Sequence, residues 1–157
     1  MGEYLSLSSI DSAIWVEITE SELSVEKIYS WTVLADCGAV VLFSGTVRDF
    51  SEGRPGVTKL SYEAYETVAI ERMTDLAKRA LSDFEDVGRV AVVHRLGEMT
   101  PGESTVIISV SAAHRDQAYE ASRFLIDTLK KSVPIWKKES WMGGSDWGLG
   151  ANSVKDT

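Results

Sequence analysis

The chain has 157 residues and a formal net charge of −8, with 44% hydrophobic and 25% charged residues. This length suits one domain with a buried core, and this composition is that of a globular protein rather than a disordered one. The acidic balance argues against a general nucleic-acid-binding protein, which would present a broad basic face.

The sequence shows no signal peptide, no membrane-spanning segment and no metal-binding motif. Met1–Ser6 lacks the basic and then apolar pattern of a signal peptide, and no apolar run approaches the roughly 20 residues that span a bilayer. We therefore expect a cytoplasmic protein without membrane contact. Cys37 is the only cysteine, so no internal disulfide or cysteine cluster for zinc is expected. Neither of the two histidines has metal-ligand spacing, so no metal site is expected.

The N-terminal half predicts strands, one short helix and a loop. Ser24 can cap a helix that begins with Val25. Polar and apolar residues alternate in 57–65, as in a half-buried strand, whereas the two glycines and the proline of 49–56 indicate a mobile loop. The predicted elements are a strand at 13–18, a helix at 25–32, a strand at 38–48, the loop at 49–56 and a strand at 57–65.

The C-terminal half predicts two long amphipathic helices separated by strands. Apolar residues recur at helical spacing in both helices, and Pro134 ends the second one. The predicted elements are helices at 67–84 and 114–132, and strands at 89–96, 104–112 and 135–141. The glycine-rich tail after Met142 is expected to be irregular. This order predicts an α+β fold, with helices packed on a mostly antiparallel sheet, in a single domain 1–157.

His114 and Arg115 lie where a strand passes into a helix. A helix N-terminus carries partial positive charge, so a base there is unfavourable unless an anion binds beside it. The helix end and the two side chains could together bind a phosphate or a carboxylate. The alternative is that Asp116 and Glu120 neutralise Arg115.

Lys130 and Lys137, with Lys131 and Lys138 beside them, form the densest group of bases in this acidic chain. A bend between helix and strand could bring positions 130 and 137 to one pocket, and clustered ammonium groups favour a neutral lysine that can act as a base or nucleophile. The alternative is a solvated lysine face, with Lys130 placed to suit the helix dipole.

Two further positions carry weaker signals. Arg48 ends a strand that contains Gly45, where the backbone can approach a ligand closely and the arginine can reach a phosphate. His94 fits a structural histidine better than a functional one. No phosphate-binding glycine loop, dinucleotide fingerprint or serine nucleophile motif is present.

Taken together, the segments resemble the large, catalytic subunit of molybdopterin synthase, the MoaE family. The resemblance covers about residues 13–147, in the order of the family. Its most specific segment is Leu129-Lys130-Lys131-Ser132-Val133-Pro134-Ile135-Trp136-Lys137-Lys138-Glu139. The other matching segments are 38–48, 60–65, His94-Arg95-Leu96-Gly97, Gly102-Glu103 and 111–115.

This resemblance implies a fold of the α/β hammerhead type and a sulfurtransferase activity in molybdenum cofactor biosynthesis. The enzyme would convert cyclic pyranopterin monophosphate to molybdopterin, with no metal or organic cofactor. Sulfur would come from the C-terminal Gly-Gly thiocarboxylate of a small ubiquitin-like subunit. Two large subunits would form a homodimer at the centre of a heterotetramer.

The resemblance also implies roles for particular residues. Lys130 would lie at the reacting centre, and Lys137 would act in proton transfer or charge stabilisation. The residues expected to bind the substrate are Thr46, Val47, Arg48, His114, Arg115, Lys138 and Glu139.

One region departs from the family pattern. Relatives can carry an arginine after the position of Trp147 that reaches the neighbouring subunit's site, but here only Lys155 is basic. A non-catalytic module that binds a ubiquitin-like protein or a pterin-like anion is the rival interpretation, and a degenerate scaffold is a third. The presence of both Lys130 and Lys137 favours catalysis.

Overall fold

The computed structural model describes residues 6–10, 12–51, 54–56, 58–141 and 144–148. The helices in these ranges are α1 (Val25–Thr32), α2 (Glu66–Asp83) and α3 (Arg115–Ser132). The strands are β1 (Ser6–Ile10), β2 (Ile14–Thr19), β3 (Ala39–Thr46), β4 (Phe50–Ser51), β5 (Arg54–Pro55), β6 (Lys59–Ala64), β7 (Val87–Arg95), β8 (Gly97–Met99), β9 (Ser104–Ala112), β10 (Ile135–Trp141) and β11 (Gly144–Gly148).

A five-stranded sheet with the order β1-β2-β7-β9-β3 forms the larger part of the fold. Its central strands β7 and β9 are nine residues long and buried over much of their length, as their runs of Val, Ile and Ala predict. Neighbouring strands are antiparallel except β2 and β7, which run parallel. Edge strand β3 has a register shift between Gly45 and Thr46, and such a bulge bends the strand where it leaves the sheet.

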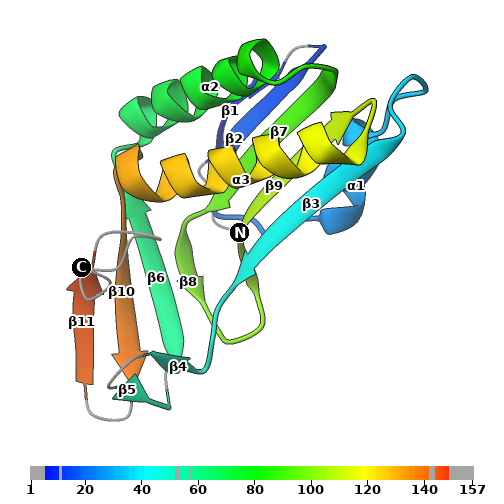
Figure 1. Cartoon of the computed structure of the whole chain (residues 1–157). Helices are drawn as coiled ribbons and strands as arrows, with labels where there is room; N and C mark the ends of the chain where they lie inside the picture. The colour runs from blue at the N-terminus through cyan, green and yellow to red at the C-terminus, as the bar shows by residue number, and fades with distance from the viewer. Residues whose placement is uncertain (1–5, 11, 52–53, 57, 142–143, 149–157) are drawn as a thin grey trace.

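The helices cover the two faces of this sheet unequally. α2 and α3 lie side by side across one face (Figure 1), and the larger core beneath them contains Met73, Ile108 and Leu125. The apolar residues of both helices recur every three or four positions, which turns one stripe toward the sheet. A smaller core on the opposite face, under α1, contains Ile28 and Val93.

A second sheet, with the order β11-β10-β6-β8, extends from the ends of the two long helices (Figure 1). β6 leads into α2 through Tyr65, and β10 follows α3 after Val133 and Pro134. The Tyr65 N–H donates to the Pro134 carbonyl at 3.2 Å, which ties the two junctions together. The C-terminal end of α3 is therefore held next to β6 and β10.

These elements confirm the α+β class and all three predicted helices to within one residue. Ser24 caps α1 as expected, since its Oγ accepts a hydrogen bond from the Lys27 N–H at 3.1 Å. The predicted alternation is also confirmed within Lys59–Ala64, because Leu60 and Tyr62 are buried and their neighbours are more exposed, whereas Val57 lies outside the described residues.

Two expectations about irregular segments were wrong, and two strands were missed. Residues 144–148 form strand β11, which pairs with β10. The two glycines of this strand lower its own strand propensity, so its pairing with β10 determines its structure. The predicted loop 49–56 contains the short β4–β5 ladder. β1 and β8 were not predicted. In the described ranges no helix is long and apolar enough to cross a membrane.

Candidate functional site

A cleft of about 390 Å³ opens where the end of β3 approaches the second sheet and the last turns of α3. Its walls come from the end of β3 and the residues after it, from β6, from the start of β9, from α3 and from β10. These segments are far apart in the sequence, so only the tertiary fold creates the cleft. Its volume is typical of sites for small molecules.

Among the residues that the structure describes, four charged side chains line the cleft: Arg48, Lys130, Lys137 and Glu139. The Lys137 Nζ lies 3.6 Å from Glu139 Oε2, and these side chains are only 11% and 6% exposed. Alternation along β10 places both on one face of the strand. Three cations against one carboxylate give the cleft an excess of positive charge, within a chain whose net charge is −8. The cleft is therefore suited to an anionic ligand.

Arg48 and Lys130 are exposed at the cleft, in contrast to Lys137. The Arg48 guanidinium carbon lies 5.1 Å from the centre of the Phe50 ring, a distance typical of a cation–π contact. Lys130 lies in the last turn of α3, where a cation also suits the helix dipole.

The other lining residues in the described ranges carry no charge. Burial, with a smaller contribution from the nearby Glu139 carboxylate, raises the pKa of Tyr62 to about 12, so this hydroxyl stays protonated at physiological pH. Thr105 Oγ1 donates to the Gly45 carbonyl at 3.1 Å. The hydroxyl-bearing lining residues are Thr46, Tyr62 and Thr105, and the apolar ones are Phe43, Phe50, Leu60, Val106 and Ile126.

Gly45 allows β3 to lie close to β9 beside the cleft. A Cβ at this position would lie 3.0 Å from Val106 Cγ1 and 3.5 Å from Thr105 Oγ1. This is closer than most side-chain contacts, so a larger residue would push β3 away from β9. The close backbone approach expected from the sequence is thus made to the neighbouring strand.

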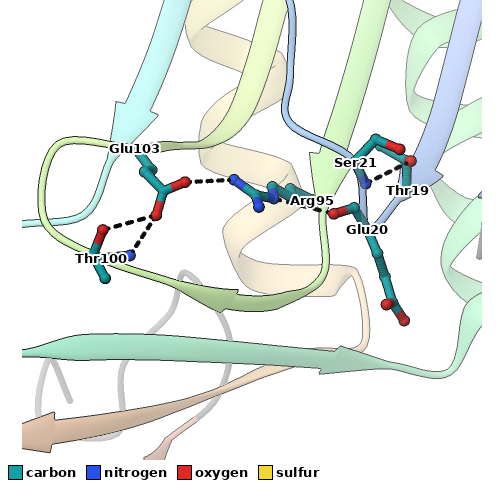
Figure 2. A network of polar contacts seen from close by, with 6 residues as sticks. All are labelled: Thr19, Glu20, Ser21, Arg95, Thr100 and Glu103. Carbon is teal, nitrogen blue, oxygen red and sulfur yellow. Dashed lines mark hydrogen bonds and ion pairs between the residues drawn. The ribbon is translucent and has the colours of Figure 1, made fainter. Parts of the chain in front are cut away.

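A network of polar contacts braces the turn between β8 and β9 (Figure 2). Arg95 Nη1 donates to Glu103 Oε1 at 2.9 Å, and Glu103 Oε2 accepts from the backbone N–H and Oγ1 of Thr100 at 2.7 and 2.9 Å. The bond from the Thr100 backbone, followed by the bond from Arg95, lowers the pKa of Glu103 to about 2. Arg95 Nε also donates to the Glu20 carbonyl at 3.3 Å.

The same turn holds the end of β3. The Val47 N–H donates to the Glu103 carbonyl at 3.0 Å, and the Gly102 N–H donates to the Val47 carbonyl at 2.8 Å. Gly102 has a φ of 96°, which glycine adopts more readily than other residues. Val47 is 3% exposed, so it fixes the backbone between Thr46 and Arg48 at the cleft wall.

The structure brings together five of the residues predicted for the site, namely Thr46, Arg48, Lys130, Lys137 and Glu139. Val47 contributes as a buried anchor rather than as a lining residue. Lys138 alternates to the face of β10 opposite Lys137 and Glu139, and it is not among the residues that line the cleft.

His114 and Arg115 lie at the other end of α3, about 22 Å from Lys130 along the helix axis. His114 is 82% exposed, and its Nδ1 lies 3.9 Å from Asp86 Oδ2. It is the N-cap residue of α3, but its side chain makes no capping hydrogen bond. In one chain, therefore, these two residues do not join the cleft.

Several lining residues were not predicted from the sequence. The alternation in 57–65 placed Leu60 and Tyr62 on one face but did not show that this face meets Lys137. Phe43, Thr105 and Ile126 carry no local signal, because their place depends on strand pairing and on helix packing. Trp136 does not line this cleft.

Trp136 instead lines a second hollow of about 230 Å³, together with Arg72 and residues 130–135. Its ring centre lies 6.0 Å from that of Tyr65. Lys130 contributes to both hollows, so its side chain lies between the cleft and this basic groove.

His94 has the structural role expected from the sequence. It is fully buried, and its Nδ1 lies 2.8 Å from the Arg95 carbonyl oxygen. Burial lowers its pKa to about 4. Cys37 is partly exposed, and burial of the thiol raises its pKa. In the part of the chain that the structure describes, no group of His, Cys, Asp and Glu residues could hold a metal ion.

Comparison with known proteins gives one consistent result. A family model described as "MoaE protein" matches residues 18–132. The molybdopterin synthase catalytic subunit of Culex quinquefasciatus is 40% identical over 136 residues, which cover 85% of this chain and 86% of that protein. The crystal structure of molybdopterin synthase from Staphylococcus aureus is similar with a TM-score of 0.78 and 34% identity, covering 83% of this chain and 93% of that one.

A third similar structure is a complex of subunits 1 and 2 of the molybdopterin-converting factor of Helicobacter pylori. The TM-score is 0.60 and the identity 23%, with 71% of this chain and 72% of that one covered. At this identity the likeness shows a shared fold, and the pairing of two subunits is a property of the Helicobacter complex.

Proposed function

The chain belongs to the MoaE family and is a catalytic subunit of molybdopterin synthase, an enzyme of molybdenum cofactor biosynthesis, and from this premise we propose that its cleft is the site of sulfur transfer. The observation that supports this proposal is the convergence of Arg48, Lys130, Lys137 and Glu139 on one cleft. The substrate proposed is cyclic pyranopterin monophosphate. The sulfur donor proposed is the C-terminal thiocarboxylate of a small ubiquitin-like subunit.

The chemistry of the cleft suits this substrate. A cyclic phosphate needs cations, and Arg48 with the two lysines provides them. A flat pterin ring needs apolar and aromatic walls, and Phe43, Phe50 and Leu60 offer them. Thr46 and Glu139 can hydrogen-bond the polar edge of the ring.

The two lysines differ in environment, and we assign them different roles. Lys137 is buried beside the Glu139 carboxylate, an arrangement that holds its ammonium in a fixed position. We assign Lys137 to stabilising the negative charge that develops during transfer. Lys130 is exposed and contributes to both hollows, so we assign it to the reacting centre, where sulfur donor and substrate meet.

The reaction needs no further reactant than water. The thiocarboxylate sulfur forms a bond to an electrophilic carbon of the substrate and gives a thioester, and an oxygen leaves that carbon. From a carbonyl carbon the oxygen is protonated and leaves as water, and from the carbon that bears the cyclic phosphate the phosphate oxygen leaves and opens the ring. Water then cleaves the bond between sulfur and the acyl carbon, which leaves sulfur on the substrate and a carboxylate on the small subunit. Two such transfers give the dithiolene. The protein contributes positioning and fixed positive charge.

His114 and Arg115 fit this function only if a second copy of the chain is present. They lie about 22 Å from Lys130 along α3, too far to share a small substrate with it. We propose that they reach the phosphate bound by a second copy within a homodimer. Their exposure is compatible with this role, and among the described residues Arg115 has no ion pair with Asp116 or Glu120. Lys138 remains a predicted substrate-binding residue, and the cytoplasmic location also remains a prediction.

The basic groove beside the cleft supports the proposed partner. The C-terminal tail of the small subunit ends in an anion and must reach Lys130. Arg72 and Lys131 line the groove together with Lys130, and neither of them lines the cleft, so a tail with an anionic end would meet positive charge there. We therefore propose that the tail approaches through this groove while the pterin occupies the cleft.

The direct test mixes the purified chain with cyclic pyranopterin monophosphate and a thiocarboxylated small subunit, and measures the oxidised, fluorescent pterin product. We expect product from the natural chain and none from Lys130→Ala. Lys78→Ala is the matched control, because Lys78 is an exposed lysine on α2 outside the cleft. If the small subunit binds but no product forms, the chain is a binding module and the catalytic proposal is wrong.

A further inference from the structure

Tyr62 is a buried cleft residue to which no role has yet been assigned. It lies on β6, is 5% exposed and lines the cleft. In the antiparallel pairing of β6 with β10 it lies directly opposite Lys137. Residues paired in this way have side chains on the same face of the sheet, with Cβ atoms about 5 Å apart. The phenol therefore shares one wall of the cleft with Lys137.

The ring of Tyr62 packs against the ring of His94. Their ring centres lie 5.0 Å apart and the rings meet edge to face, at 73°. His94 is itself fixed, because it is fully buried and bonded through Nδ1 to the Arg95 carbonyl. Such an aromatic contact orients the ring as well as burying its area. Tyr62 cannot turn away from the cleft without disturbing this buried histidine.

The hydroxyl of Tyr62 lies among polar groups of the cleft. Thr105 shares a hydrogen bond with it, and both Glu139 and Arg48 are close enough to act on its charge. Thr105 has one hydroxyl proton, so it donates either to the Gly45 carbonyl, at 3.1 Å, or to the phenol oxygen. When it donates to the phenol oxygen, the proton of the phenol is free to bind the substrate. With a pKa of about 12, the phenol is neutral at every pH at which the enzyme could work. It is thus an oriented hydrogen-bond donor that keeps its proton, on the same wall of the cleft as Lys137.

We propose that Tyr62 is a further catalytic residue, whose hydroxyl donates a hydrogen bond to the substrate oxygen on the carbon that receives sulfur. The inference rests on the proposed function. When the carbon–sulfur bond forms at a carbonyl carbon, the carbon–oxygen π bond breaks and its electron pair moves to that oxygen. The phenol keeps its proton and stabilises the new negative charge through the hydrogen bond. A donor that is already oriented needs no reorganisation during the step.

The variant Tyr62→Phe tests this role, because phenylalanine keeps the ring against His94 and removes only the hydroxyl. We expect kcat to fall about 100-fold, as for the loss of one oriented donor to a developing oxyanion, while KM for the pterin stays unchanged. The thermal unfolding midpoint and the affinity for the small subunit should also stay unchanged. Placing 3-fluorotyrosine at position 62, which keeps the hydroxyl, should restore turnover.

Tyr65→Phe is the matched control, since it removes a phenol hydroxyl three positions away on a side chain that is 65% exposed. It should leave kcat and KM unchanged. An unchanged kcat in Tyr62→Phe would overturn the inference, and so would a higher KM with unchanged kcat, which would assign the hydroxyl to substrate binding. The proposed function is judged separately, by whether the natural chain forms product and Lys130→Ala does not.

Discussion

The two ends of α3 carry basic residues in opposite settings. At the C-terminal end, Lys130 lies beside the cleft in which Lys137 is buried against Glu139. At the N-terminal end, His114 and Arg115 project into solvent. A cation suits the dipole at the first of these ends and opposes it at the second. The C-terminal end of α3, called the enclosed end below, can therefore act within one chain. At the N-terminal end, called the open end, the basic residues are unfavourable unless another molecule binds beside them.

The largest expected effect is at the enclosed end. Lys137→Met leaves the buried Glu139 without its ammonium partner, and breaking a buried pair in this way typically costs about 3–5 kcal/mol. We expect a loss of that size in the free energy of unfolding, measured in urea, together with loss of turnover. Lys59→Met removes one side of an exposed pair with Glu98 and should cost less than about 1 kcal/mol.

A double variant separates stability from catalysis at this end. Lys137→Met combined with Glu139→Gln removes both charges, so most of the lost stability should return while turnover stays absent. Recovery of turnover in the double variant would show that Lys137 matters only for folding, and the enclosed end would then lose its catalytic role.

At the open end, Arg115→Ala should change substrate binding without changing stability. Loss of one charge-assisted hydrogen bond to a phosphate would raise KM for the pterin about 10- to 100-fold. The free energy of unfolding should stay the same, because Arg115 is exposed. Steady-state kinetics and urea unfolding measure the two quantities, and an unchanged KM would remove Arg115 from the phosphate site.

Mixing variants shows whether the two ends act in different chains. Chains carrying Lys130→Ala and chains carrying Arg115→Ala, refolded together, form mixed dimers in which one of the two sites has both natural residues. At a substrate concentration well below the raised KM of Arg115→Ala, random pairing should then give about a quarter of the natural activity, since half of the dimers are mixed. If mixing gives no more activity than the two variants measured separately, the two residues do not complete one another's site.

The hydrogen bonds that Glu103 accepts at the β8–β9 turn, next to the enclosed end, predict that the free energy of unfolding depends on pH. Folding lowers the pKa of Glu103 from its ordinary 4.5 to about 2. Such a carboxylate stabilises the fold above pH 4.5, and this contribution is lost as the pH falls from 4.5 through 2. In Glu103→Gln the urea midpoint should therefore fall less steeply over that range. Glu98→Gln, at an exposed side chain, should follow the natural chain.

The smallest expected effect is a gain of stability at the open end. His114 caps α3 without a side-chain hydrogen bond, and serine is a preferred residue at this position. His114→Ser should add about 0.5–1 kcal/mol to the free energy of unfolding and lower the affinity for the pterin. A variant that gains stability and loses no affinity would show that the open end has no part in binding.

The sequence predicted the two ends of α3 unequally well. The helix itself, its end before Pro134 and the strand that carries Lys137 follow from local pattern, so the meeting of Lys130 and Lys137 could be anticipated. The split between Lys137 and Lys138 also follows from alternation, once residues 135–141 are taken as a strand. By contrast, nothing local shows that Tyr62 lies opposite Lys137, because register depends on which strands pair.

The separation of His114 from the cleft was missed for a different reason. The resemblance to the family assigns His114 and Arg115 to substrate binding without stating which copy of the chain provides them, but a straight helix of this length separates its first and last residues by more than the size of a small substrate. Strand β11 was also missed, because its structure depends on pairing with another strand. Its glycines favour irregular structure, and the edge of β10 provides the hydrogen bonds that the local sequence does not predict.

The helical phase of α3 is fixed at both ends. Before the helix, the Gly38 N–H donates to the Ala113 carbonyl at 3.2 Å, and after it Ile135 pairs with Ala64. Inserting one residue between these anchors would turn Lys130 by about 100° around the helix axis while both sheets kept their registers. Insertions and deletions among related chains should therefore occur in segments such as 49–57, and the number of residues in α3 should stay constant.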